Sequence, residues 1–194
     1  MLPNFSALSD DSGDVIGRNL KHLKFLHISN MYITDEMLVG IAEQSSGTLE
    51  ELYINKCECL RGDGLNAILR SCTKLRLAQV DSCAGRSVQL DVSLLSTLTE
   101  LHITSQGVTE AFMDSLVANC TRLQCLALDW KHSATSSAFK LEVLTAQRLP
   151  RLKVLLHRGF HQSALDKFAL MRLKVQLIKL TNNMIKPKFF DMKF

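Results

Sequence analysis

The sequence predicts an α/β solenoid, because a short motif recurs along the chain at a regular period and alternates apolar with other residues. The motif is clearest in residues 49–57, LEELYINKC, which carry apolar side chains at the first, fourth and sixth positions. Its six leading leucines are 23 to 29 residues apart: Leu23, Leu49, Leu75, Leu98, Leu123 and Leu152. A motif of this kind at this period is typical of leucine-rich repeats.

The alternation within the motif predicts a strand with two different faces. In a strand, the fourth and sixth side chains point to one face, and the third, fifth and seventh point to the other. Seventeen of the eighteen first, fourth and sixth positions are apolar, and His157 is the exception. One repeat cannot bury its own apolar face, so stacked repeats share a core. We predict six to seven repeats in a horseshoe with a parallel sheet on its concave side.

The segment after each motif predicts a helix on the convex side. Apolar residues recur at helical spacing over residues 38–42, 65–69 and 113–117. Thr34 or Asp35, and Thr109, stand where the N-caps of the first and last of these helices are expected. The third repeat is short and is rich in serine around residues 86–97, which predicts a reduced helix there.

Three regions of the chain follow from the repeats. Residues 1–22 are expected to form a degenerate repeat or N-terminal cap, residues 23–160 the regular repeats, and residues 161–194 a degenerate repeat with a capping tail. The last region is predicted to contain a helix over 164–172 and a seventh strand over 174–180. Its tail carries Phe189, Phe190 and Phe194, which are expected to cover the last strand edge, and the alternative is a partner-binding or disordered tail.

Composition limits the partners and the compartment. The 194 residues are 46% hydrophobic and 22% charged, which is typical of a globular protein. The net charge of +4 is spread along the chain and gives no argument for nucleic-acid binding. No signal peptide and no apolar run of about 18 residues is visible, so no membrane partner is expected. The six cysteines are then expected to be reduced thiols of a cytoplasmic or nuclear protein.

The cysteine spacing does not predict a metal site. Structural zinc sites pair cysteines two to four residues apart, whereas Cys57, Cys59, Cys72 and Cys83 form one close pair and two distant thiols. Small buried thiols between repeats account for these positions without a metal. The sequence also lacks a glycine-rich phosphate loop, a nucleophile elbow and clustered histidines. We expect no metal, no cofactor and no catalytic residues.

The cysteines carry a resemblance to a known family. Residues 72–83, CTKLRLAQVDSC, place a cysteine three residues before the leading leucine and another at the ninth motif position. Together with ITDEML at 33–38 and VTEAFM at 108–113, they resemble the cysteine-containing leucine-rich repeats of F-box proteins over residues 20–160. The ninth position is cysteine only at Cys57 and Cys83, and no F-box is found in the sequence.

This resemblance implies a role in ubiquitin ligation. In F-box proteins with such repeats, the repeats hold a protein substrate, and the F-box recruits the Skp–cullin ligase (SCF). The chain is therefore expected to be a non-catalytic substrate-recognition module. A Skp-type adaptor and a cullin are expected as partners only of a longer form that carries an F-box. The alternative is a stand-alone leucine-rich repeat scaffold or regulator without a ligase.

The outward strand positions form the predicted binding surface. Stacked strands turn each outward position into a column, and these columns contain aromatic side chains of the kind that anchors an interface. Acidic side chains in the centre suggest a partner segment of basic or polar character. The alternative is that these are ordinary solvated strand residues. The predicted partner-binding residues are Phe25, His27, Glu51, Tyr53, Asn55, Gln79, Asp81, Glu100, His102, Asp129 and Trp130.

Overall fold

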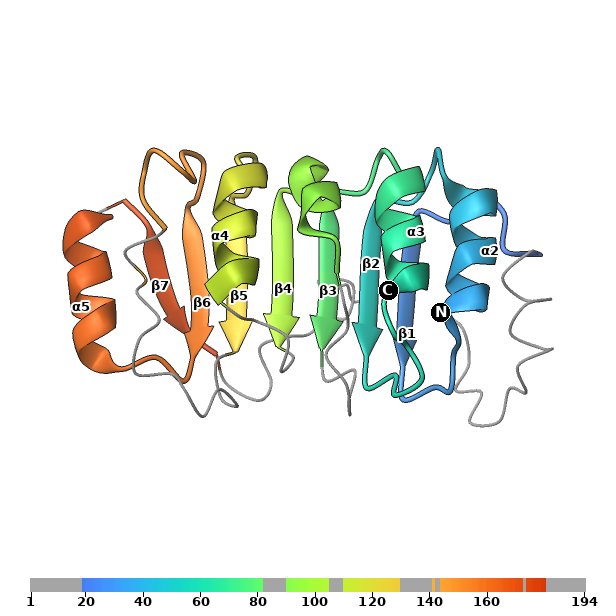
Figure 1. Ribbon diagram of the computed structural model, residues 1–194, viewed down its shortest axis with the longest axis horizontal. Helices are drawn as coiled ribbons and strands as arrows, with labels where there is room; N and C mark the ends of the chain where they lie inside the picture. The colour runs from blue at the N-terminus through green and yellow to red at the C-terminus, as the bar shows by residue number, and fades with distance from the viewer. Residues whose placement is uncertain are drawn as a thin grey trace, which may run out of the picture.

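The computed structural model contains one sheet of seven parallel strands, which lie side by side in chain order (Figure 1). It describes residues 19–81, 90–104, 110–129, 141, 144–172 and 174–180. The strands are β1 Phe25–Ser29, β2 Glu51–Asn55, β3 Leu77–Asp81, β4 Glu100–Thr104, β5 Cys125–Asp129, β6 Val154–Arg158 and β7 Gln176–Lys179. The first six start at the third position of the six motifs, as predicted.

The register of the strands places equal motif positions next to one another. Leu26 of β1 pairs with Leu52 of β2, and the fourth positions continue in line to Leu177 of β7. Five of the six leading leucines are at most 4% exposed, and Leu23 packs partly buried against the same core. The predicted interior row of leucines is therefore confirmed.

The helices cover the face of the sheet to which the fourth and sixth positions point. Their buried apolar residues share one core with these positions, and Figure 1 shows the helices lying along the row of strands. The helices are α2 Asp35–Ser45, α3 Asp63–Ser71, α4 Glu110–Asn119 and α5 Gln162–Met171, with the short 3-10 helix η1 Val92–Thr97 in the third repeat. The α/β class and the reduced third helix are confirmed. The fold is compatible with a leucine-rich repeat solenoid, and the repeat number and horseshoe curvature stay predictions.

The start of α3 is capped by the preceding repeat rather than by its own residues. The Asp35 carboxylate accepts hydrogen bonds from the backbone N–H groups of Arg61, Gly62 and Gly64, at 2.9, 3.3 and 2.8 Å. These donors surround a helix N-terminus, where backbone N–H groups lack partners within the helix. Thr34 occupies the N-cap position of α2, but its side chain makes no capping hydrogen bond. Thr109 lies outside the described residues.

Gly64 allows the two helices to approach closely. A Cβ atom at this position would lie 2.5 Å from the backbone oxygen of Asp35 and 2.8 Å from the Leu38 Cβ. Any larger residue would therefore push α2 and α3 apart. Gly62 has a φ of 124°, a conformation that favours glycine, and it forms the turn that leads into α3. Gly64 is thus required by the close contact between α2 and α3, and Gly62 by the turn that precedes α3.

The C-terminal repeat is built around a buried arginine. Arg172 is 7% exposed, and its guanidinium donates hydrogen bonds to the backbone oxygens of Leu144, Leu149 and Leu152 at 2.9, 3.0 and 3.4 Å. Burial lowers its pKa from the ordinary value. The helix and the seventh strand predicted after residue 161 are both present, as α5 and β7. Arg172 was not predicted to take part in the core.

Two of the thiols expected to be buried, Cys57 and Cys72, pack inside the structure together with Cys120, whereas Cys59 was predicted wrongly and is exposed, because it lies in the turn between β2 and α3. Cys57, Cys72 and Cys120 are at most 1% exposed, and none of the described cysteines forms a disulfide. Burial raises the pKa of Cys72 to about 11 and that of Cys120 to about 12. Both thiols are therefore protonated and unreactive near neutral pH. Cys83 and the tail after residue 180 lie outside the described residues.

Across the described ranges, no helix is long and apolar enough to cross a bilayer.

Candidate protein-binding face of the sheet

The face of the sheet opposite the core, here called the outer face, is formed by the third, fifth and seventh motif positions. Ten of the eleven predicted binding residues lie on strands at these positions. For Asp129 the structure gives the backbone position in β5, and Trp130 lies outside the described residues. The outer face divides into four groups of side chains, which follow in chain order.

An aromatic group lies on β1 and β2. The Phe25 and Tyr53 rings are tilted by 40° with their centroids 5.1 Å apart, and the His27 ring meets Tyr53 edge-on at 6.2 Å. Such contacts are favourable geometries for aromatic pairs. Burial lowers the pKa of His27, so the imidazole is neutral near pH 7. Phe25 and His27, which are half-buried, are the members of this group that a partner can contact, on the first strand of the sheet.

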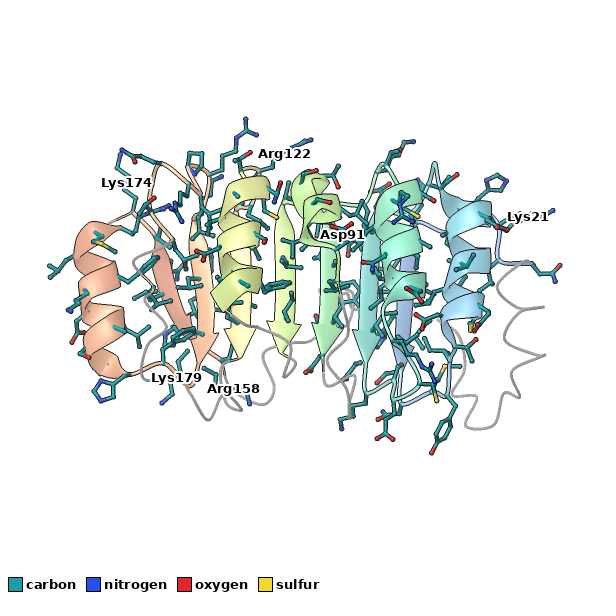
Figure 2. The ribbon with its side chains drawn as sticks, viewed as in Figure 1. Lys21, Asp91, Arg122, Arg158, Lys174 and Lys179 are labelled. Atoms are coloured by element: carbon teal, nitrogen blue, oxygen red, sulfur yellow. The ribbon has the colours of Figure 1, made fainter. Side chains whose placement is uncertain are left out.

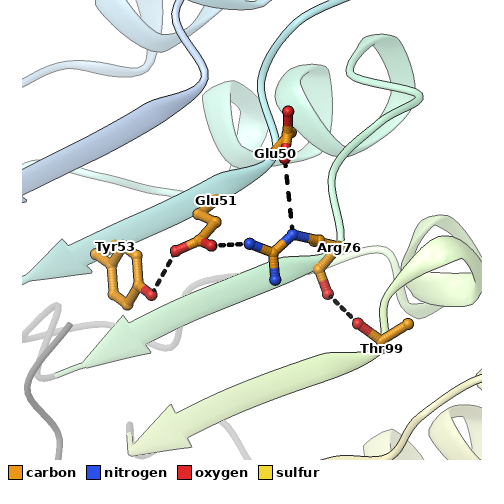
Figure 3. A network of polar contacts seen from close by, with 5 residues as sticks. All are labelled: Glu50, Glu51, Tyr53, Arg76 and Thr99. Atoms are coloured by element: carbon orange, nitrogen blue, oxygen red, sulfur yellow. Dashed lines mark hydrogen bonds and ion pairs between the residues drawn. The ribbon is translucent and has the colours of Figure 1, made fainter. Parts of the chain in front are cut away.

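An ionic group adjoins the aromatic group and joins two repeats (Figure 3). The Tyr53 hydroxyl donates a 2.8 Å hydrogen bond to Glu51 Oε2, and Arg76 forms an ion pair with Glu51 Oε1. Glu50 Oε2 lies 3.8 Å from Arg76 Nε. The Thr99 hydroxyl donates to the Arg76 backbone oxygen at 3.1 Å. Glu51 is therefore held from both sides before any partner binds.

Tyr53 differs from the prediction in its exposure. It is 2% exposed, and Gln79 is 3% exposed, so neither presents the exposed contact area that was expected. Burial is the first cause that raises the pKa of Tyr53 well above its ordinary value, and the hydrogen bond to Glu51 is the second. The hydroxyl stays protonated and acts as a donor that orients Glu51. Phe25, His27, Glu51, Asn55, Asp81, Glu100 and His102 are half-buried.

The third group contains potential metal ligands. Glu100 and His102 of β4 and Cys125 of β5 each place one ligand atom within 4.8 Å of the others. The Cys125 sulfur lies 3.9 Å from His102 Nε2. The sequence predicted two of these residues as partner-binding positions, and it did not predict that the thiol would join them.

The fourth group is apolar and basic and lies on β6 and β7. Val154, Leu156 and Ile178 are half-buried outer-face residues of these strands. Arg158, at the seventh position of β6, lies close to the edge at which the strand ends, whereas Lys179 is in register with His157 and so belongs to the inner positions (Figure 2). The outer face thus changes from aromatic and acidic at β1 to β4 to apolar at β6 and β7, with Arg158 at the edge.

Sequence reasoning missed Glu50 and Arg76, which stand at the second motif position. This position also forms a column, because Glu50 N–H donates to the Lys24 oxygen and Arg76 N–H donates to the Glu50 oxygen. The alternation of Lys24, Glu50 and Arg76 in this column was a signal for ion pairs between repeats. This column lies just before the strands, outside the columns formed by the outward strand positions.

Comparisons with known proteins give a partial similarity. No family model matches the chain. Coronatine-insensitive protein homolog 1b of Oryza sativa subsp. japonica is 28% identical over 116 residues, which cover 56% of this chain and 19% of the relative. Coronatine-insensitive protein homolog 1a of Oryza sativa subsp. indica is 28% identical over 123 residues, which cover 59% and 20%. The chain spans about a fifth of the length of the curated relatives it matches. This similarity supports a relationship to the F-box/leucine-rich repeat proteins that the sequence resembles.

Proposed function

We propose that this chain is a non-catalytic protein-binding module that holds a polypeptide on the outer face of its sheet. The observation that carries the proposal is the contrast between the two faces. The inner positions repeat one apolar chemistry, whereas the outer positions change from strand to strand. A surface that served only to stack repeats would have no reason to vary in this way.

The fixed ionic group supports recognition of a specific partner. Tyr53 and Arg76 hold the Glu51 carboxylate in one place, so a partner need not order it on binding. Phe25 beside it supplies apolar contact area, and Arg76 is 46% exposed. Arginine and aromatic side chains are enriched among the residues that dominate binding energies. A segment with basic or polar and apolar side chains fits this part of the face.

The finer proposal is that the module recognises substrates of an SCF-type ubiquitin ligase. It rests on the cysteine-containing repeats and on the partial similarity to the coronatine-insensitive protein homologues. A Skp-type adaptor and a cullin are proposed partners of a longer form that includes an F-box. The proposed compartment is the cytoplasm, the nucleus or both. Without a ligase, the same face serves a stand-alone scaffold.

Binding is tested with paired variants. Phe25→Ala and Arg76→Ala change the outer face, while Tyr32→Ala and Arg122→Ala change an exposed aromatic and an exposed arginine elsewhere. We expect partners identified by mass spectrometry to lose about 2 kcal/mol of binding, about 30-fold in affinity, only with the outer-face pair. Tyr53 is left unchanged because its burial would mix loss of folding with loss of binding.

Two results would contradict the proposal. If Phe25→Ala and Arg76→Ala recover as much partner as the wild type does, the outer face is not the binding surface. Loss with Tyr32→Ala or Arg122→Ala would move the interface to the loops that carry these two residues. The ligase proposal has a separate readout, since adaptor and cullin should co-purify with an F-box-containing form. Their absence from that form, with substrate binding retained, would leave the stand-alone scaffold.

A further inference from the structure

The group formed by Glu100, His102 and Cys125 lies where two neighbouring strands meet on the outer face. Glu100 and Cys125 are direct register partners, and His102 is two residues further along β4 on the same face. One carboxylate oxygen, one imidazole nitrogen and the sulfur lie within 4.8 Å of one another, and all three side chains are half-buried. The three ligand types therefore converge on one point.

The distance between the sulfur and the imidazole nitrogen is close to that in a tetrahedral zinc site. Zinc binds sulfur at about 2.3 Å and imidazole nitrogen at about 2.0–2.1 Å, so at the tetrahedral angle these two atoms are about 3.6 Å apart. The Cys125 sulfur and His102 Nε2 are 3.9 Å apart. A small rotation of either side chain closes this difference. The strand ladder fixes the backbone of both residues, so rotation of the side chains is what brings the two atoms together.

The ligand types select the metal. A thiolate and an imidazole favour zinc, whereas magnesium and calcium prefer oxygen ligands alone. Cysteine, histidine and a carboxylate are each established zinc ligands, and three protein ligands leave a fourth position open. An open position accepts water or a side chain of a bound protein.

Gln79 supplies an independent observation. It stands at the fifth position of β3, in direct register with His102, so the two side chains leave adjacent strands on the same face about 4.8 Å apart. It is 3% exposed, and its Oε1 atom makes no hydrogen bond with any residue in the described part of the chain. A buried amide oxygen without a partner is costly. A metal ion or its bound water beside His102 would satisfy it.

We propose that Glu100, His102 and Cys125 bind a zinc ion through a carboxylate oxygen, Nε2 and Sγ, with Gln79 Oε1 beside the fourth position. This site goes beyond the proposed protein-binding function, because it adds an ion that a partner can ligate directly. It also replaces the expectation from cysteine spacing that the chain holds no metal. Binding releases the thiol proton, since the thiolate is the zinc ligand.

The first experiment is a titration of the purified chain with Zn²⁺ and with Co²⁺ as a spectroscopic probe. We expect one equivalent per chain and, for Co²⁺, a thiolate charge-transfer band with the visible bands of a tetrahedral ion. Cys125→Ser and His102→Gln should each weaken Zn²⁺ affinity by at least about 10-fold. Cys59→Ser, at an exposed thiol, and His27→Gln, at the same motif position as His102, are the matched controls and should bind as the wild type does.

The second experiment needs no variant and so does not depend on the folding of one. Zn²⁺ should slow alkylation of Cys125 and leave that of the exposed Cys59 unchanged, as measured by peptide mapping, and Mg²⁺ should protect neither. Absence of stoichiometric Zn²⁺ binding at micromolar concentrations would overturn the proposal. Wild-type affinity in Cys125→Ser, or loss in Cys59→Ser, would place the ion elsewhere and overturn it as well.

Discussion

The inner and outer faces of the sheet are made by alternate residues of the same strands, yet they follow different rules. On the inner face, Leu26, Leu52, Leu101, Leu126 and Leu155 stand in one line and are at most 2% exposed. On the outer face, no two neighbouring groups share the same chemistry. The comparison teaches that the fold holds the inner face to one apolar chemistry, whereas the outer face varies in chemistry even though Tyr53 and Gln79 on it are also buried. This variable face is where binding functions can arise.

The largest expected effect belongs to the inner face. Leu52→Ala should lower the free energy of unfolding by about 2–5 kcal/mol, because a fully buried side chain leaves a cavity in the shared core. Leu170→Ala, at a leucine that is 75% exposed, should change it by less than about 0.5 kcal/mol. Denaturant unfolding of both variants measures the difference. Equal midpoints would contradict the division into two faces.

Arg172 tests whether a polar group can be as important to the core as leucine. Arg172→Met should cost about 2–4 kcal/mol of unfolding free energy, because the Leu144, Leu149 and Leu152 carbonyls lose their donors inside the protein. The exposed Arg151 is the control, and Arg151→Met should be nearly neutral. Thermal unfolding followed by circular dichroism compares them. Equal loss of stability from both variants would show that the buried guanidinium has no special role.

Tyr53 tests whether the outer face also contributes to stability. Tyr53→Phe should cost about 1–2 kcal/mol, because it removes a hydrogen bond to a charged carboxylate. The folded protein raises the pKa of Tyr53, so the unfolded state releases this proton first as the pH rises above about 10. Stability should therefore fall in that range, and Tyr53→Phe should make the fall less steep. Urea unfolding at increasing pH measures both effects: an unchanged slope would argue against the raised pKa of Tyr53, and unchanged stability near pH 7 would argue against the hydrogen bond.

The smallest expected effect concerns His157, the polar exception on the inner face. It is 7% exposed, and burial first and Lys179 second lower its pKa. The unfolded state then takes up a proton more readily below about pH 6.5, so stability should fall as the pH drops through that value. His157→Leu should reduce this fall. Some dependence of stability on pH should remain in this variant, because burial also lowers the pKa of His27.

The measurement is the free energy of unfolding at about pH 7.5 and about pH 5, which lie on either side of the histidine pKa. His22→Gln, at an exposed histidine, is the control. The same pH dependence in His157→Leu and the wild type would contradict the assignment.

The sequence alone could predict the strands, because alternation and period depend on single residues at fixed positions. Leu49, Leu75 and Leu98 are buried as predicted, and α2, α3 and α4 follow their apolar spacing. The cap of α3 could not be predicted in the same way. Thr34 has the local pattern of an N-cap, but Asp35 acts across repeats on Gly62 and Gly64, through a contact that depends on how closely the helices pack.

The outer-face positions were predictable and their contacts were not. Columns follow from the motif, but the reach of Arg76 to Glu51 depends on side-chain conformation. Glu100, His102 and Cys125 are close only across two strands, whereas the spacing rule for zinc compares cysteines along the chain. Arg172 was missed because its acceptors are backbone oxygens of the preceding repeat, which a pattern of side chains along the sequence does not reveal.

The Asp35 contact has a consequence for how such a chain can be cut or extended. The donors that it satisfies belong to the next unit along the sequence, so a boundary drawn between residues 35 and 61 separates a helix from the group that closes its first turn. If the second repeat is expressed alone or placed after a different repeat, the backbone N–H groups at the start of α3 lose their acceptor. They keep one only if the preceding repeat has an acidic residue at the position of Asp35. Exchange of units within this protein is thus restricted by one carboxylate, and a successful graft must carry it along.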